Sequence, residues 1–282
     1  MKEKPFKTIA IGAAFSPHTK PTLSEASRLS LFFGAQLIFI HVGEKSSKKK
    51  ENLEAILEPF IKDGLSFEII FKFGDPVEVI LSITKEEKVD LLILGALQRE
   101  NFLKYYVGSI ARKLTRQARC SVLLLIKPSA ERVPCEHIVV NGLEHPKTQE
   151  TLHSAFFVAN KLGANKVTIV EEISQQEVSV NIEDDKSLRK SAIVKERLSL
   201  REESRVKEMI KDIPVDYKKI INIKTQPIFG KRGYTIGHYA QMVRADLLVM
   251  NGPSKMTFWD RLFPHDIEHI LTELPTDVLI IQ

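Results

Sequence analysis

One loop of the sequence carries residues that could hold an anionic group. It begins at Gly95, directly after the apolar run LLILG, and ends at Gly108 and Ser109, where a helical pattern starts. Backbone N–H groups at the start of a helix, together with a serine hydroxyl, can bind phosphate oxygens. Arg99 and Lys104 add positive charge within the loop. These residues predict a site for a phosphate chain, although a loop with turn glycines and a serine near a helix start would look the same.

Other groups of reactive residue types form no complete catalytic motif. Pro17-His18-Thr19-Lys20 and Ser254-Lys255-Met256-Thr257 faintly resemble the two motifs of nucleotidyl transferases, but they lie in different halves of the chain and neither is complete. The sequence also contains no G-x-S-x-G or P-loop motif. We therefore expect a non-enzymatic protein, with weak ATPase activity left open and no catalytic residues assigned.

Histidine and cysteine spacing gives little support for a metal site. His265 and His269 are four residues apart, which would suit a divalent metal on one helix face, but a solvated helix start has the same pattern. Cys120 and Cys135 form no C-x-x-C pair, and we expect both to be reduced. No metal ligand is predicted.

The elements that must position the Gly95–Ser109 loop alternate between strand and helix patterns. Because the apolar runs are nearly continuous, they are typical of parallel strands with helices on both faces. Such a doubly wound sheet binds ligands beyond the carboxyl ends of its strands, where the loop lies. The predicted strands are 7–14, 36–42, 66–73, 89–95 and 120–126, and the predicted helices are 19–33, 50–62, 76–87 and 106–118.

The whole pattern occurs twice. Phe73-Gly74 returns as Phe229-Gly230 and Val122-Leu123 as Val278-Leu279, in both cases 156 residues later. An internal repeat of this kind indicates two copies of one structural unit. We therefore predict a first domain over 1–130 and a second over 134–282, joined by a linker that contains proline and charged residues. The second set of strands is expected near 136–141, 166–172, 217–228, 246–251 and 276–281.

The second copy is longer than the first. Gly34-Ala35 returns as Gly163-Ala164 only 129 residues later, so about 27 additional residues follow this point in the second copy. They fall around 175–213, where Glu, Lys and Arg are dense, as on an exposed helix with charge pairs four residues apart. We therefore predict a helical insert there.

The final strand of each copy raises a question of pairing. If the two apolar strands near 120–126 and 276–281 lay at sheet edges, both edges would be exposed. Pairing one with the other would cover both, which predicts an intramolecular pseudo-dimer of the two domains.

These features, together with Phe15-Ser16-Pro17-His18 and Gly74-Asp75-Pro76, resemble the universal stress proteins in their tandem form. The resemblance implies two five-stranded sheets of the adenine nucleotide alpha hydrolase-like fold. It also implies that ATP or another adenine nucleotide binds in the first domain. Members that bind a nucleotide carry Gly-x2-Gly-x9-Gly-Ser/Thr. By this resemblance, Val42 would contact the adenine through its backbone, and Gly95, Arg99, Gly108 and Ser109 would complete the site.

Two residues of the first copy depart from the pattern of that family. Gln98 stands where the middle glycine is expected, and its Cβ would disfavour a positive φ and hinder close approach of the backbone to phosphate. Ala14 stands where ATP-binding members carry an aspartate at the end of the first strand, so an oxygen ligand is lost.

The second copy departs further. Its loop keeps the spacing but replaces all three glycines, with Asn251, Ser254 and Pro264, and has His265 in place of Ser or Thr; Asn141 takes the acidic position. We therefore expect no nucleotide in the second domain. Trp259, Phe258 and Phe263 in this loop are more typical of packing than of a ligand site.

Two functions stand at this point. The first is a regulatory module of the stress response that binds an adenine nucleotide in the first domain without turnover. The second is an interaction scaffold that binds no nucleotide and uses the insert and the aromatic loop. The composition, 43% hydrophobic and 27% charged, is that of a soluble protein. We expect a cytoplasmic protein with an unknown protein partner, a homodimer as a further option, and neither a membrane nor a nucleic acid as its target.

Overall fold

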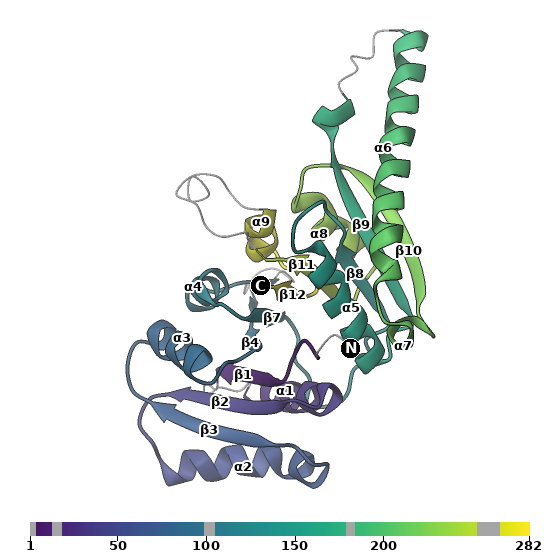
Figure 1. Ribbon diagram of the computed structural model, residues 1–282. Helices are drawn as coiled ribbons and strands as arrows, with labels where there is room; N and C mark the ends of the chain where they lie inside the picture. The colour runs from purple at the N-terminus through teal and green to yellow at the C-terminus, as the bar shows by residue number, and fades with distance from the viewer. Residues whose placement is uncertain (1–3, 13–18, 99–104, 179–183, 253–265) are drawn as a thin grey trace. The chain divides into compact units, whose positions relative to one another are not determined.

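The computed structural model describes residues 4–12, 19–98, 105–178, 184–252 and 266–282 (Figure 1). The chain divides into two compact units, and each has its own core. Unit 1 contains Met1–Pro134 together with Leu271–Gln282, and unit 2 contains Cys135–Ile270. The domain limits expected from the sequence, 1–130 and 134–282, stay a prediction about independent folding.

Unit 1 is a doubly wound sheet with the strand order β12-β7-β4-β1-β2-β3. All its strands are parallel to their neighbours except β12, which runs antiparallel to β7. The central strands form the core, and every residue of β7 is buried. In chain order the main elements are β1 (Thr8–Gly12), α1 (Thr19–Phe33), β2 (Gln36–Val42), α2 (Ser47–Lys62), β3 (Phe67–Lys72), α3 (Pro76–Glu86), β4 (Leu91–Gly95), α4 (Ser109–Gln117), β7 (Ser121–Leu125) and β12 (Asp277–Ile281).

The strand order creates one crevice for a ligand. From β1 the chain first builds β2 and β3 on one side, and then returns to place β4 and β7 on the other side. The connections therefore diverge between β1 and β4, and a crevice opens at the carboxyl ends of these two strands. The loop after β4 follows directly from this edge.

Strand β12 covers the edge of β7. Val278, Leu279 and Ile280 face Leu124, Leu123 and Val122 across the antiparallel ladder. The Asp277 carboxylate also accepts a hydrogen bond from the backbone N–H of Ile126 at 2.8 Å. A strand that the sequence assigns to the second repeat thus completes the sheet of unit 1, and removes an apolar edge that would otherwise be open.

Unit 2 has the parallel strand order β10-β9-β8-β11. The sequence predicts a strand from residue 217, but a short helix that follows Pro214 occupies 215–218, and the strand begins at Asn222. In chain order the elements are β8 (His137–Asn141), α5 (Thr148–Leu162), β9 (Lys166–Ser174), the 3-10 turn η1 (Gln175–Val178), α6 (Asp185–Lys211), α7 (Val215–Lys218), β10 (Asn222–Gly230), α8 (Tyr234–Met242), β11 (Leu247–Asn251) and α9 (Asp266–Thr272).

The repeat extends to matched hydrogen bonds. Asp90, just before β4, accepts the backbone N–H groups of Lys7 and Thr8 at 2.8 and 2.9 Å. Asp246, just before β11, accepts those of Glu136 and His137 at 2.8 and 2.9 Å. Each aspartate therefore fixes the start of the first strand of its unit, which explains why Asp-Leu-Leu occurs in both copies.

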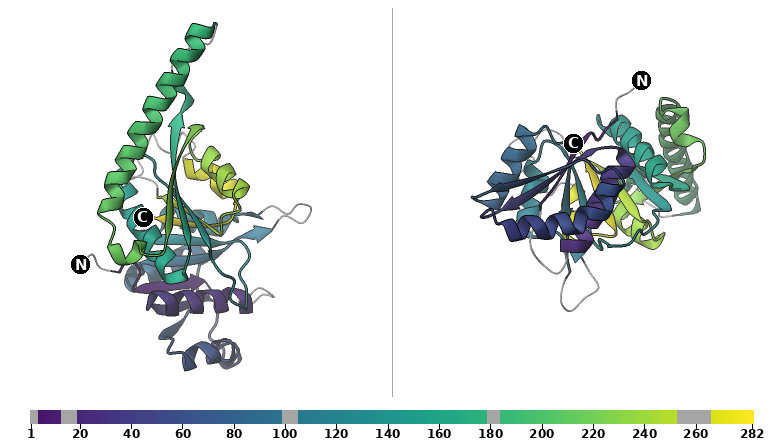
Figure 2. Two further views of the ribbon diagram at one scale, coloured as in Figure 1. Left: turned by 90° about the vertical axis from the view of Figure 1, so that its right-hand side faces the viewer. Right: turned by 90° about the horizontal axis from the view of Figure 1, so that it is seen from below.

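Helix α6 occupies most of the stretch in which the sequence places the insert. It starts in a capping box, in which Asp184 accepts the Ser187 N–H and the Ser187 hydroxyl accepts the Asp184 N–H. The helix packs on β9 and β10 and rises beside η1 (Figures 1 and 2). Ser191, Glu202 and Val206 are its buried residues. Within the described residues, none of the helices is long and apolar enough to cross a membrane.

Candidate functional site

The crevice of unit 1 is bordered by two residues that the sequence singles out. Val42 is half-buried and ends β2, where it pairs with Lys72 of β3. Gly95 is exposed and ends β4, where it pairs with Leu125 of β7. Because β1 lies between β2 and β4, the two residues flank the carboxyl end of β1, which is Gly12. Arg99, Ala14 and Phe15–His18 lie outside the described residues.

The loop after β4 contains a small sheet that the sequence did not indicate. Strand β5 (Leu97–Gln98) pairs antiparallel with β6 (Tyr105–Tyr106). The Val107 N–H donates to the Leu271 carbonyl at 3.1 Å, and the Leu274 N–H donates to the Tyr105 carbonyl at 3.0 Å. These two bonds connect the β5–β6 arm to the segment before β12, and so they fix the residues that lead into α4.

The start of α4 has backbone N–H groups that no described residue uses as hydrogen-bond donors. Gly108 is the N-cap residue, with φ −63° and ψ 166°, and no side chain in the described part of the chain caps the helix. The first helical bond runs from the Arg112 N–H to the Gly108 carbonyl, at 2.8 Å. The preceding N–H groups and the exposed Ser109 therefore concentrate positive potential at this end of the helix, and its first turn has no acidic residue to offset it.

Neither glycine of this edge has an unusual backbone conformation, and only Gly95 borders open space. A Cβ at Gly95 would meet no atom within 4 Å, and one at Gly108 would lie 2.9 Å from the Leu97 Cδ1 atom. Neither glycine has a positive φ, and the backbone of Gln98 is also extended, in β5. Gln98 therefore has no positive φ here, and the expectation that its Cβ hinders close approach of the backbone to phosphate stays a prediction.

Lys49 is a cation near the Val42 position that sequence reasoning missed. Its ammonium nitrogen lies 3.1 Å from Nε2 of the buried His41, the neighbour of Val42 on β2. The only sequence signal is the run KSSKKK, which reads as a solvated stretch.

In unit 2, side chains fill the equivalent strand ends. Asn251, at the position of Gly95, donates from its amide to the Thr148 hydroxyl at 3.1 Å. Asn141, which ends β8 as Gly12 ends β1, accepts the Leu143 N–H at 2.8 Å. Both amides are thus engaged in holding the loop after β8, where unit 1 has only glycine.

Glu171 is the second difference between the two units, and it was not predicted from the sequence. It stands 129 residues after Val42 and is only 1% exposed, and neither of its carboxylate oxygens has a hydrogen-bond partner within the described structure. Burial raises the pKa of Glu171 to about 7, against an opposing effect of the nearby Arg205. The Glu171-Glu172 doublet inside an apolar strand was the signal that could have revealed it.

Helix α6 closes this edge of unit 2. Arg205 donates to the Gly142 carbonyl just beyond β8 and forms an ion pair with Glu202 at 2.9 Å. A Cβ at Gly142 would lie 2.7 Å from the Ile169 side chain, so the backbone there is closely packed. A long helix, and not an open crevice, therefore covers the end of β8.

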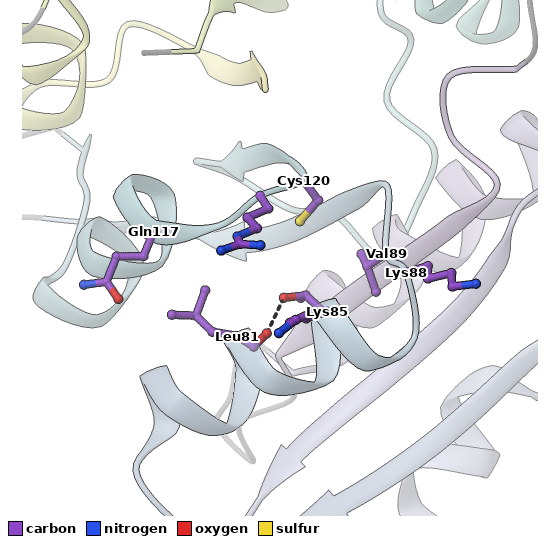
Figure 3. Close-up of a pocket in the computed structure, with 8 residues that line it drawn as sticks. Leu81, Lys85, Lys88, Val89, Gln117 and Cys120 are labelled. Carbon is purple, nitrogen blue, oxygen red and sulfur yellow. Dashed lines mark hydrogen bonds between the residues drawn. The ribbon is translucent and has the colours of Figure 1, made fainter. Parts of the chain in front are cut away.

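A cavity at the opposite edge of unit 1 has a different character. It has a volume of about 450 Å³ and contains Lys85, Lys88, Arg119 and Cys120 in its lining (Figure 3). Helices α3 and α4 end here, and cations at helix C-termini balance the helix dipole. Burial raises the pKa of the Cys120 thiol to about 11, so the reactive thiolate is suppressed.

The described residues give no support for a metal site. They contain no cluster of three or more His, Cys, Asp or Glu side chains that could hold an ion. His265 lies outside them, and the His269 ring packs edge-on against Tyr234 at 6.3 Å.

Comparison with known proteins relates the first half of the chain to one family. The sequence model of the universal stress protein family matches residues 44–125, from the end of β2 to the end of β7. The chain is 28% identical over 91 residues to a universal stress protein of Synechocystis, and 30% identical over 96 residues to a universal stress protein A-like protein of Arabidopsis thaliana. These alignments cover 32% and 33% of the chain and 59% and 54% of the relatives, so the chain spans about half the length of each.

A solved structure extends the likeness to both units at the level of fold. A universal stress protein from Archaeoglobus fulgidus superposes with a TM-score of 0.69, covering 99% of this chain and 99% of that one, at 16% sequence identity. Residues 44–125 therefore match the universal stress protein family, and over its full length the chain shares the α/β fold of that solved structure.

Proposed function

We propose that this chain is a regulatory protein of the stress response that binds an adenine nucleotide, such as ATP, in unit 1 and does not turn it over. The observation that carries the proposal is the open carboxyl edge of β1 and β4, next to the uncapped start of α4. Gly95 leaves space there, and the backbone N–H groups that no described residue uses would receive the phosphates together with Ser109. Val42 would border the base.

The absence of turnover belongs to the same proposal. The described residues that we assign to the nucleotide are Val42, Gly95, Gly108 and Ser109, and none of these four is an ordinary general base or acid. Nucleotide is therefore expected to act as a bound ligand that shifts the population of the protein between states.

Unit 2 is expected to bind no nucleotide at the strand ends that match the crevice of unit 1. Asn141, Glu171 and Asn251 replace the small and apolar residues of unit 1, and Arg205 of α6 bonds to the backbone at the end of β8. We propose that this unit pairs with unit 1 as an intramolecular pseudo-dimer.

A second function rests on the surface of α6. Leu188, Ile193 and Leu200 are 52%, 50% and 56% exposed on this helix. An interaction scaffold that presents α6 to a protein partner would use them, with or without bound nucleotide. Replacing all three with Gln would then abolish capture of the partner and leave nucleotide affinity unchanged.

The nucleotide proposal can be tested on purified protein. Heat denaturation should release ATP, ADP or AMP into the supernatant, and ATP with Mg²⁺ should raise the melting temperature of the stripped protein. Gly95→Val should abolish both effects because its side chain would enter the open space at the end of β4 where the phosphates are proposed to lie. Ala130→Val, at an exposed residue of the linker, is a control of similar size. The proposal would be refuted if no nucleotide were released and millimolar ATP did not shift the melting temperature. Steady ATP turnover that one side-chain substitution abolishes would instead indicate an enzyme.

A further inference from the structure

Unit 2 contains a cavity that the nucleotide proposal does not use. It has a volume of about 810 Å³ and lies between the end of β9, the start of η1, the loop 230–233 and the first turn of α8. This is the carboxyl edge of β9 and β10, which is the side of such sheets where ligands bind. Its volume lies within the range of small-molecule sites, roughly 300–1,000 Å³.

The charge of this loop is reversed between the two copies. In unit 1, Asp75 caps α3 by accepting the N–H groups of Val77 and Glu78 at 2.9 and 3.1 Å. Lys231 stands at the corresponding position, 156 residues later, and Arg232 follows it. The loop that carries a carboxylate in unit 1 therefore carries two cations in unit 2.

Glu172 has taken over the capping task in unit 2. This residue of β9 is 3% exposed, and its carboxylate accepts the N–H groups of Gly233 and Ile236 at 3.1 and 2.9 Å. Because the cap comes from the strand beneath, the start of α8 is already satisfied, and the side chains of Lys231 and Arg232 are not needed there. The cavity thus owes its character to these side chains and not to the end of the helix.

Both cations are exposed and available. Neither Lys231 nor Arg232 forms an ion pair within the described structure. The acidic residue of η1, Glu177, lies 3.4 Å from Arg201 of α6 and is engaged there. Two adjacent positive charges at a concave surface repel each other, and a bound dianion would relieve this repulsion through charge-assisted hydrogen bonds.

Tyr234 gives the same cavity an aromatic surface. Its side chain lines the cavity and is 59% exposed. The ring is parallel to that of His238, with centroids 6.3 Å apart, and meets the His269 ring edge-on. The ring is thus supported by two neighbours while more than half of it stays open for stacking.

Thr235 restrains the conformation of the loop. The Thr235 hydroxyl donates to the Lys231 carbonyl at 2.9 Å, and it packs so closely on Gly230 that a Cβ there would overlap it. Only glycine therefore fits at the end of β10. Lys231, Arg232 and Tyr234 extend from a turn that this packing restrains. Such preorganisation lowers the cost of binding a ligand.

We propose that this cavity binds a phosphate monoester that carries a planar ring. A phosphate monoester has a charge of about −1.5 to −2 near pH 7, which two cations match. Its phosphate would lie between Lys231 and Arg232, and its ring would stack on Tyr234. The site shares no residue with the crevice of unit 1, so it stands independently of the function proposed above.

The test uses AMP as the probe and the full-length, isotope-labelled protein. AMP should shift the backbone amide resonances of residues 230–235 in a saturable way. Lys231→Ala combined with Arg232→Ala should weaken this binding at least about tenfold, the loss expected when charge-assisted hydrogen bonds are removed. Tyr234→Leu should weaken it about fivefold or more through the lost stacking. Lys224→Ala removes an exposed charge from β10 outside the cavity and should change nothing.

Two partial ligands separate the contributions of phosphate and ring. Ribose 5-phosphate and adenosine should each bind at least about tenfold more weakly than AMP. Unchanged resonances at millimolar AMP, or equal affinity in the double variant, would overturn the site. Ribose 5-phosphate binding as tightly as AMP would overturn the role of the ring. Binding in unit 1 shifts different resonances, so failure of one site can be distinguished from failure of the other. The titration of the unmodified protein tests the cavity even if a variant folds poorly.

Discussion

At the residue level, the two units differ most at the carboxyl ends of their strands. Unit 1 has Gly12, Val42 and Gly95 there, which leave room for a ligand. Unit 2 has Asn141, Glu171 and Asn251, whose polar groups face inward and, for the two asparagines, bond to the surrounding loops. Three residue differences on the same scaffold thus distinguish the open strand ends of unit 1 from the filled strand ends of unit 2.

Glu171 makes a pH-dependent contribution to stability. Its pKa is raised from 4.5 to about 7 in the folded protein, so the folded state binds a proton that the unfolded state has lost between these values. The free energy of unfolding should therefore fall as pH rises from about 4.5 to 7, by at most about 3 kcal/mol. Glu171→Gln should remove this loss, and urea unfolding at pH 5 and pH 8 measures it.

The neighbouring Glu172 provides the control. Its carboxylate is used by α8, so Glu172→Gln should destabilise the protein at pH 8, where Glu171→Gln stabilises it. If Glu171→Gln left the difference between pH 5 and pH 8 unchanged, the buried carboxylate would not be its source.

The paired aspartates make matching contributions to the two units. Asp90→Ala and Asp246→Ala each remove the acceptor for two backbone N–H groups at the start of a strand. Each change should lower the free energy of unfolding by about 2 kcal/mol. Asp63→Ala, at the exposed end of α2, should cost under about 0.5 kcal/mol. Thermal unfolding monitored by circular dichroism would refute the structural role if all three variants behaved alike.

At the element level, α6 is the principal addition to unit 2. Its C-terminal half is fixed by Glu202, Val206 and the bond from Arg205 to the end of β8. Its N-terminal half is exposed apart from Ser191 and a few half-buried positions. We therefore expect its stability to be uneven along its length.

Arg205→Ala should release the C-terminal half of α6. The change removes an ion pair with Glu202, whose side chain is 8% exposed, and the bond to the Gly142 carbonyl. Because Glu202 keeps its ion pair with Arg201 at 2.8 Å, the change should cost about 1 to 2 kcal/mol and speed amide hydrogen exchange over 201–211. Arg197→Ala removes an exposed arginine of the same helix and is the matched control. Equal exchange in both variants would show that Arg205 does not hold the helix.

Most elements were predictable because their signals are local. The strand 36–42 and the helix 19–33 have the predicted bounds, since a continuous apolar run and a periodic one are each bounded by turn residues. The predicted strand 217–228 began too early because Pro214 starts a helical turn over 215–218, just before the β-branched residues Ile220 and Ile221. The β5–β6 arm was missed because its pairing depends on bonds to Leu271 and Leu274, far along the chain.

The candidate site was less predictable than the fold. The positions of Val42, Gly95 and Ser109 relative to β1 follow from the strand order, which the alternating pattern suggests. Nothing local indicates that Arg205 reaches the end of β8, or that Glu171 is buried without a partner, because both depend on how a 27-residue helix packs.

At the level of the whole molecule, the last strand of the chain belongs to the sheet of the first unit. Strand β12 pairs with β7, and Asp277 caps the backbone of Ile126. A chain of residues 1–134 would therefore expose the β7 edge, whose five residues SVLLL are all buried in the full protein. An open apolar edge is a template for pairing with another chain.

Light scattering after gel filtration measures this consequence. Residues 1–134 alone should self-associate through β7, and Leu123→Lys in that fragment should reduce the association. A fragment that stays monomeric and as stable as unit 1 in the full chain would mean that β12 is dispensable.

The most direct measurement of the central claim is calorimetric titration of nucleotide-free protein with ATP and Mg²⁺. One site per chain is predicted, and Gly95→Val should weaken it at least about tenfold, because the added side chain enters space that is open in the structure. Arg205→Ala, in unit 2, should leave the affinity unchanged. Absence of heat at millimolar ATP, two equal sites, or the same affinity in Gly95→Val would contradict a single nucleotide site at the edge of unit 1.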